Sequence, residues 1–359
     1  MIFRILLCAS FATACSAADA TPRPKDVLAI MRHVNEWQKA NPIMKAMDRN
    51  WERGTWYTGV MAAWRATGDR AFLDQALAWG KLHEWQVGTE QDGANRLFCV
   101  ETWAELYFKE RDRSIIAPAI RWLDTNAPNS PGGARVWYLE GKYRYVDSLY
   151  GAAALAMLAK ATGDPKYLAI MHAFFSDVTE ELWGQDSGLY YRDSRYKGQL
   201  SANGKKIFWS RGNGWAFAGI ARILEYLPES DPQRGEYIAI FRRMAGELVK
   251  RQAPDGLWRA SLDDPDAFPD PETSGTGFFC YGLAWGISHG LLNRRQYLPN
   301  VERAWDGLVR NVSPEGKVLW GQQVDGQPNA TTRDRTHEYV TGTFLLAGSE
   351  VYKLVVAQQ

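Results

Sequence analysis

The sequence predicts an all-α protein, an (α/α)6 toroid of six helical hairpins with short turn-and-strand loops at one rim. Two helix–turn–helix junctions and a spaced series of glycine turns point to this fold. The first 20 residues aside, about 339 residues remain, which is nearly six units of about 57 residues each. An irregular array of helices that does not close into a ring is the alternative.

The two junctions use the same local signals. In Gly68-Asp69 and again in Gly163-Asp164-Pro165, glycine ends one helix and aspartate caps the next, with the proline expected at the first helical position. Apolar residues at helical spacing follow each junction. The repeated unit is therefore a helix, a tight turn and a second helix.

A turn before a short apolar strand recurs further along the chain. It occurs at Asp186–Tyr190, Asp255–Trp258 and Glu315–Trp320, and the glycines of successive turns lie 68 and 60 residues apart. This spacing is close to the expected unit length. Because no linker rich in proline or serine interrupts the pattern, residues 21–359 are expected to form one domain.

Residues 1–20 have the features of a secretory signal. Arg4 precedes an apolar run over Ile5–Ala14, and small residues continue to Ala20. The run is shorter than the roughly 20 residues that span a bilayer, so no membrane span is expected. We expect a periplasmic or secreted bacterial protein. The segment Ala12–Cys15 loosely resembles a lipoprotein box, so a lipid anchor on Cys15 is the alternative.

Composition narrows the choice of partners. The 42 Lys and Arg residues nearly balance the 41 Asp and Glu residues, which argues against a nucleic-acid binder. Sixteen Trp and sixteen Tyr suit a cleft that stacks on sugars. We expect an oligosaccharide partner and a monomer or weak dimer. Cys99 and Cys280 stand in apolar segments, so free buried thiols are expected, with a disulfide as the alternative.

Several kinds of site are not indicated. The five histidines show no close metal-ligand spacing, and the cysteines show none either. No nucleophile elbow, P-loop or dinucleotide fingerprint is present. We therefore expect no metal and no cofactor.

A first candidate site lies in the segment Phe208–Trp215. Two glycines bracket Asn213 between Trp209 and a helix expected to start near Trp215, which predicts a tight polar turn with aromatic walls. An arginine in such a turn, Arg211, can grip a carboxylate with two parallel hydrogen bonds. A simple helix-capping loop is the alternative.

A second candidate is Asp147, within the run Tyr143–Tyr150 that opens a helix. An isolated aspartate at a helix start commonly only caps the helix. The surrounding aromatic and basic residues, Tyr150 among them, also make a cleft position plausible, where Asp147 would act as a general acid.

Four segments in series carry a family resemblance. They are Phe208–Trp215, Gln252–Trp258, Pro271–Phe278 and Phe344–Glu350. In this order they resemble the unsaturated rhamnogalacturonyl hydrolases of glycoside hydrolase family 105 and their relatives in family 88. The resemblance covers most of the chain from about Trp51 to Leu354 and implies the (α/α)6 fold.

The resemblance also implies an activity. Members remove a 4,5-unsaturated uronic acid from the non-reducing end of oligosaccharides that a polysaccharide lyase has left. For this chain we expect oligosaccharides of the rhamnogalacturonan type. An aspartate protonates the vinyl ether, and water then adds to the neighbouring carbon. Asp147 matches that aspartate, and Arg211, Asn213 and Trp215 match the cleft loop. Trp209 and Tyr150 are expected to bind substrate beside them.

One departure from the family pattern concerns the second acidic position. Relatives carry Ala-Asp-Asp where this chain has Ala94-Asn95-Arg96, so Asn95 stands in the place of an acid. Asn95 can form hydrogen bonds but cannot act as a base. Asp92 or Glu101 could substitute, the specificity could differ, or activity could be lost.

Arg192 stands where some relatives have a histidine. It either binds the substrate carboxylate or pairs with Asp193 on the surface. Two alternatives to the hydrolase stay open: a non-catalytic sugar-binding relative, suggested by Asn95, and a sugar 2-epimerase on the same fold. The epimerase would need facing histidines, and the histidines here are scattered.

Overall fold

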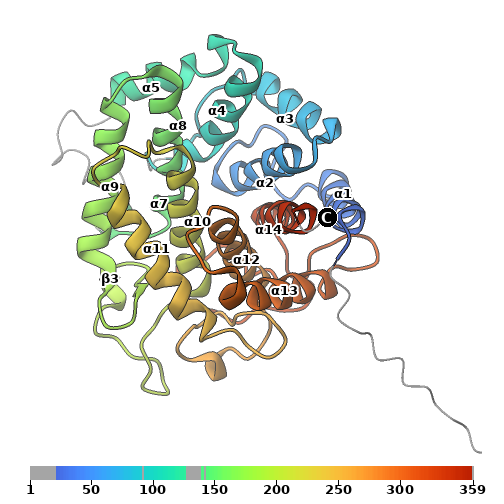
Figure 1. Ribbon diagram of the computed structural model, residues 1–359, viewed down its shortest axis with the longest axis vertical. Coiled ribbons are helices and arrows are strands. Elements are labelled where there is room, and N and C mark those ends of the chain that lie inside the picture. The colour runs from blue at the N-terminus through green and yellow to red at the C-terminus, as the bar shows by residue number, and fades with distance from the viewer. Residues whose placement is uncertain (1–21, 91–92, 127–138, 141–142, 358–359) are drawn as a thin grey trace, which may run out of the picture.

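Helices arranged in two concentric rings make up the molecule (Figure 1). The structure is a computed structural model, and it describes residues 22–90, 93–126, 139–140 and 143–357. The expected signal segment, residues 1–20, and the alternative anchor at Cys15 lie outside the described residues. The ring arrangement confirms the predicted (α/α)6 toroid.

The inner ring consists of helices that run in the same direction, each contacting its two neighbours and closing where α14 meets α2. They are α2 (Trp51–Thr67), α4 (Phe98–Glu110), α7 (Ser148–Gly151) continued by α8 (Ala153–Thr162), α10 (Ser210–Tyr226), α12 (Thr273–Ser288) and α14 (Glu338–Val356).

The outer ring consists of the helices that alternate with these along the chain. They are α1 (Pro24–Ala40), α3 (Arg70–Leu82), α5 (Ala117–Asn126), α9 (Lys166–Leu182), α11 (Arg234–Val249) and α13 (Arg294–Arg310). The inner helices are buried on nearly all sides, between the outer helices and the ring's own interior.

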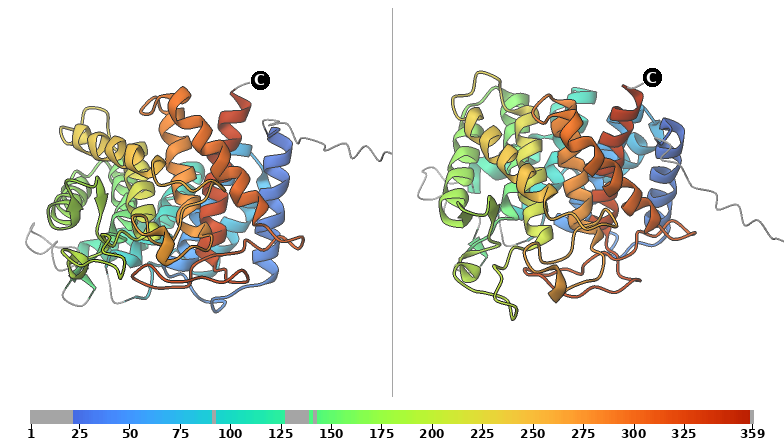
Figure 2. Two further views of the ribbon diagram at one scale, coloured as in Figure 1. Left: turned by 90° about the horizontal axis from the view of Figure 1, so that it is seen from below. Right: turned by 60° about the horizontal axis from the view of Figure 1, so that its bottom comes forward.

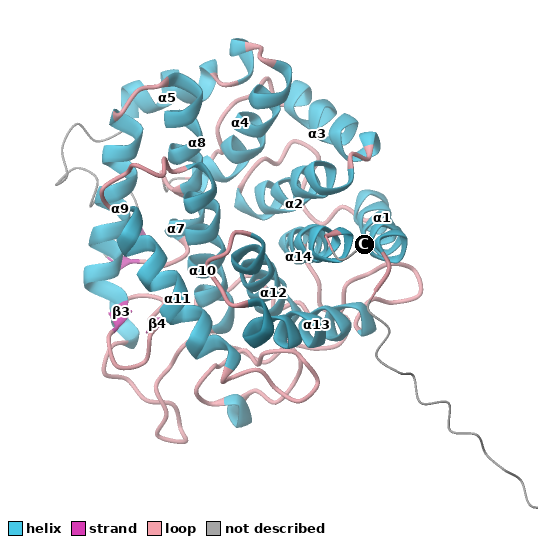
Figure 3. Ribbon diagram, in the orientation of Figure 1, coloured by secondary structure: helices cyan, strands magenta, loops and turns pink. Residues whose placement is uncertain are grey.

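Short elements decorate the loops (Figure 3). The 3-10 helices are η1 (Asn95–Leu97), η2 (Arg113–Ile115), η3 (Ser194–Tyr196) and η4 (Pro265–Ala267). Two antiparallel pairs join β1 (Leu139–Glu140) to β2 (Tyr143–Arg144) and β3 (Trp183–Gly184) to β4 (Leu189–Tyr190). Of the three predicted turn–strand segments, only the first contains a two-residue strand. The other two are reduced to single bridges at Trp258 and Val318.

The predicted junctions are confirmed with one shift. Gly68 has φ 71° and ends α2, and the Asp69 side chain accepts a hydrogen bond from the backbone N–H of Ala71. At the second junction Gly163 has φ 76°, but α9 begins one residue after Pro165 instead of at it. Glycine is favoured at both ends because other residues rarely adopt positive φ.

All the inner helices begin at the same end of the ring, and the longest loops gather there (Figure 2). We call this end the loop rim. Asp147, Asn95 and Arg211 all stand at or next to the first turn of an inner helix and so lie on the loop rim. The fold therefore collects the predicted site residues at one face of the molecule.

The expectation of free buried thiols is confirmed. Cys99 and Cys280 are both buried free thiols, and burial raises the pKa of Cys99 to about 12. In the described part of the chain, no helix combines the length and apolar character needed to cross a membrane.

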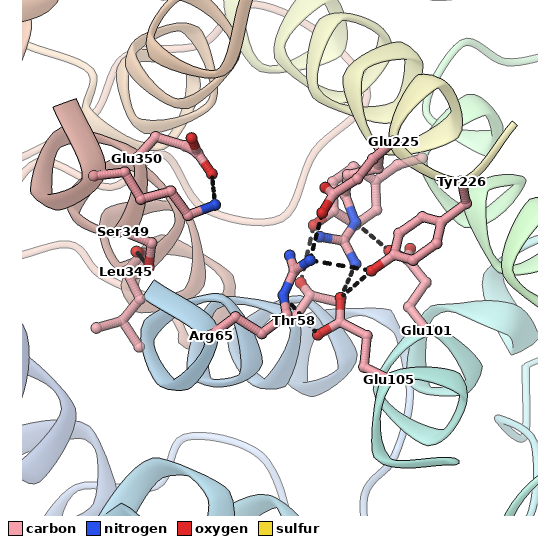
Figure 4. A network of polar contacts seen from close by, with 12 residues as sticks. Thr58, Arg65, Glu101, Glu105, Glu225, Tyr226, Leu345, Ser349 and Glu350 are labelled. Carbon is pink, nitrogen blue, oxygen red and sulfur yellow. Dashed lines mark hydrogen bonds and ion pairs between the residues drawn. The ribbon is translucent and has the colours of Figure 1, made fainter. Parts of the chain in front are cut away.

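A buried network of charged side chains joins α2, α4 and α10 inside the ring (Figure 4). Arg222 donates Nε to Glu101 and Nη2 to Glu105, the latter at 3.1 Å. Arg65 lies 3.3 Å from Glu105 and donates to Glu225 at 2.5 Å. Charges buried this completely are tolerated only when they are paired, so Arg222 is central to the network.

We expect Arg222→Met to destabilise the protein by about 3–5 kcal/mol, because the change leaves the carboxylate of Glu101 buried without its cation and removes one of the two cations beside Glu105. Urea unfolding measures the loss. Arg70→Met is the matched control: its pair with Asp74 is largely exposed, so a change below about 1 kcal/mol is expected. Equal effects of the two substitutions would contradict a structural role for the buried network.

Candidate active site

Asp147 stands directly before α7, where its side chain makes no capping hydrogen bond and is 15% exposed. The side chain of Asp147 therefore does not cap the helix, which was the alternative role for this residue. The preceding residues are held in place by the strand beside them: Val146 donates its backbone N–H to the carbonyl of Arg192, and Tyr145 bridges to Asp193. A partly exposed carboxyl on a fixed backbone is suited to meet a ligand at the loop rim.

Arg192 is buried and lies between two carboxylates. Its Nη2 donates to Asp147 Oδ2 at 3.5 Å, and its Nη1 donates to Asp193 Oδ2 at 3.1 Å. The guanidinium also lies over the ring of Tyr145, 5.2 Å from its centroid. The expected pair with Asp193 is present, but it is not on the surface, and the contact with Asp147 places Arg192 in the site.

Asp193 holds the guanidinium of Arg192 in place. Burial alone would raise the pKa of Asp193, but hydrogen bonds from Arg195 and Arg192 hold it below its usual range. Arg195 donates Nε and Nη2 to the two Asp193 oxygens at 2.9 and 2.7 Å while its side chain stays 44% exposed. The carboxylate of Asp193 is thus shared by one buried and one exposed arginine.

Asn95 is linked to the same centre through Tyr145, whose hydroxyl donates to Asn95 Oδ1 at 3.1 Å. Asn95 opens η1, and η1 contacts α7 directly after Asp147. Of the two alternatives for a second acid, Asp92 lies outside the described residues. Glu101 is fully buried against Arg222 and does not face the site.

Arg211 does not have the predicted role of gripping a substrate carboxylate. Its Nη1 donates to the carbonyl of Gln322 at 2.8 Å and to the hydroxyl of Tyr339 at 3.2 Å. Its Nη2 donates to the carbonyls of Gln323 at 2.8 Å and Asp325 at 3.4 Å. Because both terminal nitrogens bind the chain itself and the residue is buried, Arg211 anchors the loop that precedes α14.

Asn213 and Trp209 also bind the protein itself. The Asn213 amide donates to the carbonyl of Tyr190 and accepts its backbone N–H, both at 2.9 Å. Trp209 donates its ring N–H to Gln322 Oε1 at 2.7 Å. The predicted tight turn is wrong as well, since α10 already begins at Ser210. Both residues are buried, and these hydrogen bonds give them a structural role.

Trp215 and Tyr150 belong to an aromatic cluster beneath the loop rim. Trp215 packs against Phe278 at 4.4 Å, Tyr150 at 5.1 Å and Phe98 at 5.6 Å between ring centroids. Both residues are almost completely buried, so the prediction that they touch substrate is not supported. Trp51 contacts this cluster, with its ring centroid 5.8 Å from that of Trp215. It is partly exposed, whereas the other four residues are buried.

Two residues that the sequence did not single out shape the site. Tyr145 connects Asn95 with Arg192, and Trp51 stacks on Tyr339 at 5.2 Å. Tyr145 stands two residues before Asp147, and no sequence signal indicates the direction of its side chain. Trp51 had one usable signal, an aromatic residue at the start of an inner helix.

Two side chains on the α2–α14 side of the loop rim have pKa values that differ from the usual values of glutamate and histidine. Burial raises the pKa of Glu52 to about 7, with Asp48 and Glu338 acting in the same direction. Burial lowers the pKa of His337 to about 4. Near neutral pH His337 is therefore uncharged, and Glu52 keeps its proton to higher pH than an exposed glutamate does. No three described His, Cys, Asp or Glu residues form a group that could hold a metal ion.

We expect Arg211→Lys to lower the melting temperature. A lysine has one nitrogen and cannot replace both terminal nitrogens of Arg211, so carbonyls of Gln322, Gln323 or Asp325 lose their partner, at about 1–3 kcal/mol for each buried group. Thermal unfolding measures the loss. A variant with unchanged stability and a raised KM would contradict the anchoring role and restore direct contact with substrate.

Comparison with known proteins agrees with the motifs. The sequence pattern of Glycosyl Hydrolase Family 88 matches residues 25–355. An unsaturated 3S-rhamnoglycuronyl hydrolase from Formosa agariphila is 31% identical over 339 residues, covering 89% of this chain and 88% of that protein. A protein of the same name from an Alteromonas species is 39% identical over 231 residues, covering 63% of this chain and 56% of that protein.

Solved structures agree as well. A family 88 glycosyl hydrolase from Bacteroides vulgatus superposes with a TM-score of 0.83 at 31% identity, covering 92% of this chain and 99% of that one. A possible family 105 member from Salmonella enterica shares the fold, with a TM-score of 0.78 at 20% identity, covering 98% of this chain and 100% of that one. The resemblance noted from the motifs is confirmed: the chain belongs to glycosyl hydrolase family 88 and is a glycoside hydrolase.

Proposed function

We propose that this enzyme removes a 4,5-unsaturated uronic acid from the non-reducing end of lyase-generated oligosaccharides in which a 3-sulfated rhamnose follows the uronate. The observation that carries the proposal is the pair at the loop rim, Asp147 with its partly exposed carboxyl and Arg192 beside it. A proton donor next to a fixed cation is what an unsaturated, negatively charged sugar requires.

The chemistry follows from the vinyl ether of such a sugar. Asp147 gives its proton to carbon 4, and the positive charge develops at carbon 5, stabilised by the ring oxygen. Water adds to carbon 5 and returns a proton to the Asp147 carboxylate. The resulting hemiketal opens to a ketone, and the hemiacetal left at carbon 1 then releases the next sugar. The glycosidic bond is thus broken by hydration and rearrangement instead of direct displacement.

The neighbouring residues take distinct roles in this proposal. Arg192 attracts the carboxylate of the unsaturated sugar while it keeps Asp147 oriented. Tyr145 and Asn95 supply neutral hydrogen-bonding groups that orient the attacking water. Trp51 offers its ring to a sugar face. An uncharged Asn95 does not repel the substrate's own anionic groups, which suits a substrate that carries both a carboxylate and a sulfate.

The names of the relatives from Formosa and Alteromonas support the sulfated substrate. Within this chain, Arg195 lies next to Arg192 across Asp193 and is 44% exposed, so it can meet an anionic substituent on the following sugar. A rhamnogalacturonan fragment is the second candidate and lacks the sulfate. The sugar 2-epimerase alternative is disfavoured by the family assignment.

We also propose that the protein is exported to the periplasm or secreted. The apolar run over Ile5–Ala14 after Arg4 supports the proposal, and attachment of a lipid at Cys15 is its variant. Lyase products of large polysaccharides form outside the cytoplasm, so export would bring enzyme and substrate together.

We expect the wild-type enzyme to abolish the ultraviolet absorbance of unsaturated uronyl-rhamnose 3-sulfate faster than that of an unsulfated rhamnogalacturonan disaccharide. Asp147→Asn should lower turnover by about 100- to 10,000-fold because an amide cannot donate the proton. Asp164→Asn, an exposed helix cap, is the control and should retain activity. An Asp147→Asn variant with more than about a tenth of wild-type turnover would show that another group is the acid.

The role of Asn95 has its own test. Asn95→Asp places a second carboxylate on the element that contacts α7, and two carboxylates that lie close together hold their last shared proton to higher pH. We expect the alkaline limb of the pH–rate profile to move to higher pH. If KM rises and the limb stays in place, the new charge repels substrate without coupling to Asp147.

A further inference from the structure

The loop of residues 322–329 is fastened at several points before it reaches α14. Arg211 binds the carbonyls of its first half, and the Gln322 side chain donates Nε2 to the carbonyl of Gln327 at 2.9 Å. On the opposite side, the hydroxyl of Tyr196 donates to Gln327 Oε1 at 3.0 Å. We call residues 322–329 the anchored loop, because these bonds fix its position relative to α10 and η3.

The anchored loop passes over the guanidinium of Arg192 at Gly326. A methyl group built on Gly326 would lie 3.2 Å from Arg192 Cζ, 3.4 Å from Nη1 and 3.5 Å from Nε. Gly326 is not among the residues with positive φ, so its backbone conformation does not by itself require glycine. What excludes a side chain there is the close approach of the anchored loop to Arg192.

Arg192 thus lies over the Tyr145 ring and close to the anchored loop at Gly326. Its edge nitrogens meet Asp147 and Asp193. A planar guanidinium fixed by these neighbours keeps its N–H groups directed, whereas a displaced one would turn away from Asp147. A side chain at position 326 would enter the space next to the guanidinium, so Arg192 would have to give way.

We propose that Gly326 is a positioning residue: the anchored loop sets the plane of the Arg192 guanidinium, and through it the direction in which Asp147 and the substrate carboxylate meet. This proposal rests on the proposed function of Asp147 and Arg192. It assigns a catalytic consequence to a glycine that touches neither the reacting atoms nor the substrate, and it explains why Arg211 is committed to the loop and not to a ligand.

Two variants at Gly326 and a matched glycine control test the proposal. Gly326→Ala requires Arg192 to shift by a few tenths of an ångström, and Gly326→Val requires more. We expect kcat to fall about 10-fold and about 100-fold respectively, with little change in melting temperature, since small misplacements of a catalytic constellation are costly. Gly235→Ala on α11, where nothing lies within 4 Å, should match wild type.

A double-mutant cycle separates action through Arg192 from any other effect. In an Arg192→Lys background the planar group is gone, so Gly326→Ala should change kcat less than about 2-fold. An equal loss in both backgrounds would overturn the proposal, because the anchored loop would then act on substrate directly. Wild-type kcat in Gly326→Ala would overturn it as well.

A crystal structure of Gly326→Ala gives an answer that does not depend on turnover. The Arg192 guanidinium should be displaced from its position beside Asp147, and an unmoved guanidinium would overturn the proposal. The failure of the proposed function has a different signature, namely a wild-type enzyme that consumes no unsaturated disaccharide while Arg192 still moves in the variant.

Discussion

The contact between α2 and α14 closes the inner ring, and the site depends on that closure. The two helices come from opposite ends of the chain and approach so closely that a methyl group on Gly59 would lie 2.4 Å from the carbonyl oxygen of Gly342. At the loop rim, Arg53 and Glu338 form a buried ion pair across the same contact, at 2.7 Å. Because each inner helix is positioned by its neighbours, an open ring would separate the loops that bring the site together.

Closure of the inner ring also explains why Arg211 and Arg192 have different roles. Arg211 lies in the first turn of α10, beneath the loop that leads from α13 to α14, and its N–H groups satisfy carbonyls that would otherwise be buried without partners. Arg192 lies on a loop outside the helices and contacts carboxylates instead. The same residue type is therefore structural in the first turn of α10 and beside the proposed acid in the loop after β4, according to which partners the backbone places nearby.

The parts of the structure that follow local rules were predictable from sequence. The junction at Gly68-Asp69 depends only on neighbouring residues, and the same is true of the helix start after Asp147. The role of Asp147 as the acid comes from a family pattern and stays a prediction. The role of Arg211 was not predictable, because its acceptor on Gln322 lies 111 residues away in the sequence. The approach of Gly326 to Arg192 is likewise a product of tertiary packing, which no local motif encodes.

The central claim is that Asp147 protonates a vinyl ether, so that hydration and not direct displacement breaks the glycosidic bond. A single turnover in isotopically labelled water tests it most directly. The account predicts deuterium at carbon 4, labelled oxygen at carbon 5 and loss of the double bond in the released uronate. A product that keeps its double bond and carries labelled oxygen at carbon 1 would contradict it.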